Sequence, residues 1–185
     1  METRKFACLQ LVPKVEPKAS PEYLERQFDD LRIEALEDSE LLLMDSEQFS
    51  RVLKRARNFL RGMTQEGIPG IPSLEWSLIA LHQATSLADS SDRDSCLLFI
   101  KLAHLANSDF RDRFDENSFN TPVMASGVIN CANHLQVSFD NCLQYLISGE
   151  RKYLLKAHLR LEDALMSIVS QFTGPIKRNA HIGLN

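Results

Sequence analysis

The sequence of 185 residues lacks the cysteine pairs that hold metals or cross-link secreted domains. Its four cysteines, Cys8, Cys96, Cys131 and Cys142, include no Cys-x-x-Cys motif. Cys131 and Cys142 fall about three turns apart on one expected helix, roughly 16 Å, which is too far for a disulfide bond. We therefore expect free, buried thiols, as in a protein of a reducing compartment.

Long apolar runs are also missing. No run of about 18 apolar residues occurs, so the sequence predicts no membrane span. Residues 1–10 lack the apolar core of a secretory signal peptide. We therefore expect a cytoplasmic and nuclear protein. The formal net charge of −4 argues against nucleic-acid binding through overall charge, so RNA binding would need a local basic face.

Motifs for catalysis are equally scarce. The sequence contains no His-Glu-x-x-His and no Glu-x-x-His pair, so we expect no metal and no cofactor. It has no Gly-rich phosphate-binding loop, and no cysteine or serine in the setting of a catalytic nucleophile. Arg151 and His158 are separated by six residues, as in the Arg-x(4–6)-His motif of the all-helical HEPN ribonucleases. About one such pair is expected by chance in a chain of this composition, so we do not expect an enzyme.

What the sequence does contain is helical periodicity. An N-terminal arm, residues 1–46, carries one expected helix that starts at Ser20-Pro21, where the serine can cap and the proline is tolerated. Leu24, Phe28, Leu31 and Ala35 recur on it at helical spacing. Residues 6–12 and the apolar quartet Leu41–Met44 are candidates for short extended segments.

The helical bundle is expected over residues 47–175, followed by a loose tail at 176–185. Apolar spacing predicts its helices at 49–61, 73–88, 96–106, 122–147 and 150–172, with Asp45 and Gln48 capping the first and Gly62 ending it. The helix at 96–106 is apolar on nearly all sides, which predicts a central position. The last two helices should form an antiparallel hairpin. The fold class is therefore an all-α bundle of five or six helices with an extended arm.

A basic face stands out on the helix at 49–61. Five cations occupy the arc opposite its apolar side: Arg51, Lys54, Arg55, Arg57 and Arg61. Such a face is either simply solvated or a site for an acidic partner, an RNA backbone or a membrane surface. We expect RNA binding to be indirect or weak, and we expect no membrane binding.

Several short segments occur in an order that resembles one family. Residues 17–24 read Pro-Lys-Ala-Ser-Pro-Glu-Tyr-Leu, and Ile33-Glu34-Ala35 and the quartet Leu41–Met44 follow. Residues 76–81 read Trp-Ser-Leu-Ile-Ala-Leu, and residues 98–103 read Leu-Phe-Ile-Lys-Leu-Ala. Asp115-Glu116 and the apolar helix 123–135 complete the series. Together these segments, within residues 13–135, resemble the Gemin-two family, the proteins that interact with the survival-of-motor-neuron protein (SMN).

The chain departs from this family in three ways. The family's long polar linker is absent, the tryptophan needs a shift of one residue to align, and the helix at 150–172 has no counterpart.

The resemblance implies a protein-binding subunit rather than an enzyme, one that holds Sm proteins during spliceosomal snRNP assembly. The arm and first helix would contact Sm proteins, and the helical domain would bind an amphipathic SMN helix. The matching arm positions are Tyr23, Leu24, Phe28, Leu31, Ile33, Leu41, Leu42 and Leu43. The matching groove positions are Trp76, Leu81, Leu98 and Leu102. The alternatives are a generic helical regulatory adaptor, or an RNA-binding helical protein or HEPN-like ribonuclease that uses Arg151 and His158.

Overall fold

The structure is a computed structural model that describes residues 43–90 and 92–173. In these two ranges it contains α-helices and one short 3-10 turn but no strand, which confirms the all-α fold class. The elements are α2 (Ser46–Gln65), α3 (Ile71–Leu87), α4 (Arg93–Arg113), η1 (Glu116–Ser118), α5 (Pro122–Ser148) and α6 (Arg151–Thr173). The helix expected from Ser20, the segment 6–12, Leu41 and Leu42, and the tail at 176–185 lie outside the described residues.

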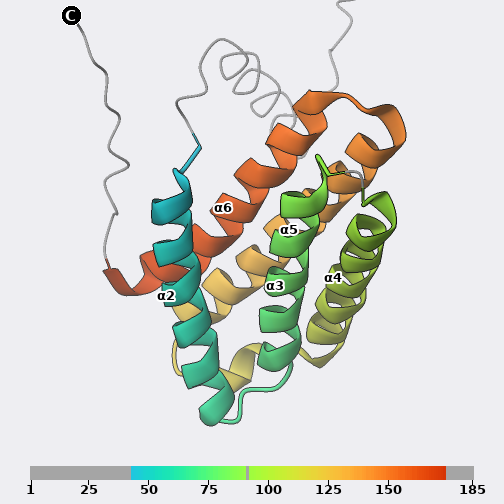
Figure 1. Cartoon of the computed structure of the whole chain (residues 1–185). Coiled ribbons are helices and arrows are strands. Elements are labelled where there is room, and N and C mark those ends of the chain that lie inside the picture. Colours follow the sequence, from blue (N-terminus) through green and yellow to red (C-terminus); the bar gives the residue numbers. More distant parts are fainter. Residues whose placement is uncertain (1–42, 91, 174–185) are drawn as a thin grey trace, which may run out of the picture.

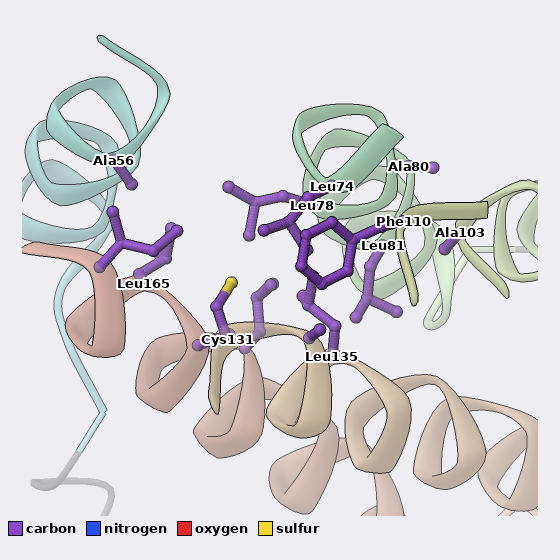
Figure 2. Close-up of a cluster of buried hydrophobic side chains, with 14 of the residues drawn as sticks. Ala56, Leu74, Leu78, Ala80, Leu81, Ala103, Phe110, Cys131, Leu135 and Leu165 are labelled. Carbon is purple, nitrogen blue, oxygen red and sulfur yellow. The ribbon is translucent and has the colours of Figure 1, made fainter. Parts of the chain in front are cut away.

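The helices form two layers (Figure 1). One layer holds α2, α3 and α4 side by side, and the second is the α5–α6 pair. The core lies between the layers. Leu78 and Leu81 of α3 and Phe110 of α4 meet Leu135 of α5, and Leu165 of α6 lies close to α2 (Figure 2).

Local capping explains where several helices begin and end. The Asp45 carboxylate accepts a hydrogen bond of 2.7 Å from the Gln48 N–H and starts α2. The Thr121 hydroxyl accepts one of 3.2 Å from the Met124 N–H and starts α5. Gly149 ends α5 in the left-handed conformation, at φ 73°, which favours glycine. The sequence predicted the Asp45 cap, and the structure confirms it.

The loop after α2 is shorter than the sequence predicts, and that prediction is wrong at both of its ends. Helix α2 continues past Gly62 to Gln65, because a helix tolerates an interior glycine at a modest cost. The next helix begins at Ile71 after Gly70, so Ser73, where the sequence predicted its start, lies inside its first turn. The Ser73 hydroxyl instead donates a hydrogen bond to the Asp109 carboxylate on α4. A serine that reads as a helix cap in sequence is therefore a tertiary contact between two helices.

Helix α4 is longer than the sequence predicts. It covers Arg93–Arg113, which is 21 residues, and so includes residues 107–113, which lie beyond the end of the helix predicted at 96–106. Asn107 and Phe110 continue its buried side, and the Asn107 amide donates 3.1 Å to the Ala132 carbonyl of α5. The expected central position is wrong too, since α4 lies at the edge of its layer beside α3 (Figure 1).

The expected α5–α6 hairpin is confirmed. The Ser138 hydroxyl of α5 donates 2.6 Å to the Ala157 carbonyl of α6. Near the other end, a Cβ atom at Gly127 would lie only 2.8 Å from the Ser167 carbonyl oxygen. The two helices therefore approach so closely there that only glycine fits without displacement.

Candidate protein-binding site

The clearest surface feature is a row of outward leucines on α4. Leu98, Leu102 and Leu105 are spaced by four and three residues, which places them on one side of the helix. They are 55 %, 45 % and 65 % exposed, respectively. The opposite side of α4 carries the buried Cys96 and Ile100. We call these three leucines the α4 stripe.

Trp76 adds an exposed aromatic side chain on the neighbouring helix α3. The Ser77 hydroxyl donates 2.9 Å to the Ala103 carbonyl, and the Cys96 thiol donates 3.3 Å to the Ala84 carbonyl. These contacts show that α3 and α4 run antiparallel, so that Trp76 lies beside the middle of α4. Trp76 is 67 % exposed. Exposed apolar side chains on adjacent helices are typical of a surface that binds another protein.

One residue expected in this site lies elsewhere. Leu81 is fully buried and packs in the core with Leu135 (Figure 2), so its assignment to a binding groove is wrong. It follows Trp76 by five residues, which rotates it about 140° around the helix. Leu105, in contrast, was missed by the sequence analysis. Its spacing of three from Leu102, on the side opposite Ile100, was the signal that could have identified it.

Charged side chains surround the α4 stripe. Asp94 and Asp112 are exposed beyond its two ends, and Lys101 is exposed between Leu98 and Leu105. The Arg111 guanidinium donates 2.7 Å to the Asn133 amide oxygen of α5 and is thereby turned toward the second layer. An apolar centre with charges at its edge is the usual composition of a protein interface.

Most of the arm residues expected to bind an Sm-like partner precede the first residue that the structure describes. Tyr23, Leu24, Phe28, Leu31, Ile33, Leu41 and Leu42 lie outside the described residues. Leu43 is described and packs against Leu159 of α6. The next residue, Met44, donates its N–H to the Glu162 carboxylate at 2.8 Å. The last part of the apolar quartet is thus in contact with the bundle itself.

The basic face of α2 divides into two parts. The Nε atoms of Arg57 and Arg61 both lie 3.1 Å from the same Glu75 carboxylate oxygen, so these two cations bind α3. Arg51 makes only a long, exposed ion pair of 3.9 Å with Glu47. Lys54 and Arg55 are exposed. The outward basic face therefore consists of Arg51, Lys54 and Arg55, three of the five expected residues.

The structure places Arg151 and His158 two turns apart on α6. Arg151 is exposed at the start of the helix, whereas His158 is largely buried. Burial lowers the pKa of His158, and the nearby Asp89 partly opposes that shift while His82 adds to it. Asp89 also accepts a hydrogen bond of 2.6 Å from the Tyr145 hydroxyl. His158 is therefore neutral near pH 7 and sits among residues that link α3, α5 and α6.

The buried thiols are unreactive. Cys96, Cys131 and Cys142 are free and buried, as the sequence predicted, and burial raises the pKa of all three thiols, that of Cys142 to about 12. Among residues 43–90 and 92–173, no three His, Cys, Asp or Glu side chains converge as a metal site would require. Every helix in these ranges is too short or too polar to cross a lipid bilayer.

Comparison with known proteins adds no relative. No protein-family model matches the chain, and no significant similarity to a curated protein or to a solved structure is found.

Proposed function

We propose that this chain is a non-enzymatic protein-binding subunit whose α3–α4 surface docks an amphipathic helix of a partner protein. The observation that carries the proposal is the α4 stripe, with Trp76 exposed on the adjacent helix. Three leucines spaced by four and three residues offer about 10 Å of apolar ridge, which matches two turns of a partner helix. Tryptophan is among the side chains that most often provide a large share of the binding energy at such a site.

The resemblance to the Gemin-two family supports an SMN-like helix as the partner and a role in spliceosomal snRNP assembly, in the cytoplasm and nucleus. The residues that carry the resemblance include Trp76, Leu98 and Leu102, and all three are exposed. Sm-fold proteins would be the second partner, bound through the arm. Asp94 and Asp112 favour a partner helix with basic residues beyond its apolar face.

The test compares two serine variants of the full chain in pull-downs, with an SMN-like amphipathic helix as bait. Leu98→Ser/Leu105→Ser removes two members of the α4 stripe, and we expect binding to fall at least tenfold. Ile147→Ser is the matched control, because Ile147 is an equally exposed apolar residue on a different helix, α5. The control should bind like the unmodified protein.

Thermal melts of both variants check the fold, and neither should shift by more than a few degrees. Equal binding by the stripe variant and the unmodified protein would reject the α4 stripe as the docking surface. Affinity purification from cells with mass spectrometry then tests the biological assignment. SMN and Sm proteins among the captured proteins support it, and ribosomal or toxin-related proteins in their place contradict it.

A further inference from the structure

Helix α6 buries apolar side chains on two opposite sides. Leu161 and Leu165 are fully buried and face the core. Leu159 is only 5 % exposed, although it lies about 160° around the helix from Leu161. Leu155 and Met166 share the outer side with Leu159 and are partly buried. A helix at the surface of a bundle ordinarily has a solvated outer side, so something beyond the two layers covers α6.

Two residues that precede α2 contact this outer side. Leu43 packs against Leu159. The Met44 N–H donates a hydrogen bond of 2.8 Å to the Glu162 carboxylate, and Glu162 is only 3 % exposed. A carboxylate this well buried needs hydrogen-bond donors to offset its lost hydration. The chain is therefore anchored on α6 just before α2 begins at Ser46.

The segment on the N-terminal side of this anchor can reach along α6. Residues 20–35 carry the apolar repeat Leu24, Phe28, Leu31 and Ala35. As a helix they would be about 24 Å long, shorter than the roughly 35 Å of α6. The seven residues from 36 to 42 can span up to about 25 Å when extended. Neither length nor connection prevents this segment from lying on the outer side of α6.

Charge also matches the two surfaces. Residues 20–35 contain five acidic and two basic side chains. The outer side of α6 carries Lys152 and Lys156 in its first half, where Lys152 also pairs with Glu150 at 2.6 Å. Arg160 at its flank pairs with Asp163 at 3.5 Å. An acidic amphipathic segment next to these cations is electrostatically favourable.

We propose that residues 20–35 dock as an amphipathic helix on the outer side of α6 of the same chain, beside the anchor formed by Leu43 and Met44. This assigns the apolar face of the arm an intramolecular partner. One consequence rests on the proposed function: an Sm-like partner of the arm would have to displace it from α6. The docking itself does not depend on that function.

The experiment uses the full chain and two observables. Hydrogen–deuterium exchange with mass spectrometry reports on the amides of residues 20–35, and methyl NMR of the methionines reports on Met166 and Met44, with the core residue Met63 as internal reference. Phe28→Ser/Leu31→Ser removes two apolar contacts of the arm without touching the bundle. Arg26→Ser/Asp29→Ser is the matched control, since it introduces two serines at positions outside the apolar repeat and keeps the net charge.

In the unmodified protein and the control, we expect exchange in residues 20–35 to be at least tenfold slower than in Phe28→Ser/Leu31→Ser. The same apolar variant should shift the Met166 methyl signal and leave that of Met63 in place. Equally fast exchange in all three proteins, or an unmoved Met166 signal, overturns the proposal. Protection that disappears on dilution together with a dimer in light scattering also overturns it, because a second copy would then be the occupant. Loss of SMN-like binding has no bearing on these observables, so the proposed function can fail separately.

Discussion

Helices α4 and α6 are of similar length, and both flank α5, yet their outer sides differ sharply. The α4 stripe (Leu98, Leu102 and Leu105) is at least 45 % exposed, whereas Leu159 on the outer side of α6 is 5 % exposed. Helix α4 packs on its neighbours with one side only. Helix α6 packs tightly on α5 through the Ser138–Ala157 hydrogen bond and also receives Leu43 and Met44 on its other side.

This contrast shows that apolar residues outside a core have two different roles. Leu159 on α6 is buried against Leu43, which precedes α2, so it contributes to the stability of the chain itself. Those on α4 remain at least 45 % exposed within the described residues, and they form the surface on which the proposed partner helix would dock. Comparing substitutions on the two helices measures this difference directly.

The largest expected difference in the free energy of unfolding is between truncating leucines on α6 and truncating a leucine on α4. Leu165→Ala removes a fully buried side chain of α6 and should lower the free energy of unfolding by about 2–5 kcal/mol. Leu159→Ala should cost about 1–3 kcal/mol, because its side chain is buried against Leu43. Leu105→Ala on the α4 stripe should change the free energy of unfolding by less than about 0.5 kcal/mol. Urea denaturation measures all three.

If Leu159→Ala lowered the free energy of unfolding as little as Leu105→Ala, the outer sides of α6 and α4 would not differ in burial as described. A cost for Leu105→Ala as large as that for Leu159→Ala would mean that the α4 stripe is covered within the chain, and the docking proposal would lose its main support.

The second effect concerns the close contact between α5 and α6. Gly127→Ala places a methyl group 2.8 Å from the Ser167 carbonyl oxygen, and a backbone atom cannot simply rotate away. We expect a loss of about 1–3 kcal/mol in the free energy of unfolding. Gly62→Ala on α2 is the matched control, since nothing lies within 4 Å of its added Cβ. It should raise stability by about 0.5–1 kcal/mol through higher helix propensity. Equal changes in the free energy of unfolding for Gly127→Ala and Gly62→Ala would mean that α5 and α6 do not approach closely.

A smaller effect should appear on acidification. Burial lowers the pKa of His158 on α6 and that of His82 on α3 below the usual value of 6.5. The unfolded chain therefore takes up a proton at each site more readily than the folded chain does. The stability from the neutral histidines is complete above pH 6.5 and is lost as the pH falls through the lower folded values. We expect the melting temperature to fall between pH 7 and pH 5.

His158→Gln should reduce this fall without abolishing it, because His82 still titrates. A melting temperature that falls equally in the variant and the unmodified protein would contradict the assignment.

The His158→Gln variant also tests the ribonuclease alternative. We expect the unmodified protein to cleave no RNA. If the unmodified protein cleaved RNA and both Arg151→Ala and His158→Gln abolished the cleavage, the non-enzymatic proposal would be overturned.

The smallest effect is expected on the outward basic face of α2. Arg51→Glu/Lys54→Glu/Arg55→Glu should change the free energy of unfolding by less than about 0.5 kcal/mol, since these side chains are exposed. Arg57→Glu/Arg61→Glu is the contrasting variant, because it places two anions beside Glu75 and should be clearly less stable. RNA affinity measured across salt concentrations decides the role of the face. A drop in affinity with a flatter salt dependence in the triple variant would identify an RNA site there.

Much of the fold could be predicted because helix boundaries are local. Asp45, Thr121 and Gly149 act on backbone groups within one turn, so their effect is readable from neighbouring residues. The errors arose where a residue was used for a tertiary contact. Ser73 bonds α4 instead of capping α3, and Asn107 bonds the Ala132 carbonyl and so extends α4 where a loop was expected.

The candidate site divides in the same way. Apolar spacing by itself determined that the α4 sequence is apolar on nearly all sides, and the family resemblance implied Trp76, Leu98 and Leu102 as candidate binding residues. Only the tertiary structure decided that Leu81 belongs to the core, that Leu105 belongs to the stripe, and that Glu75 takes Arg57 and Arg61 out of the outward basic face. The physical reason is that periodicity gives the direction of a side chain around its own helix, whereas burial depends on which other segment lies in that direction.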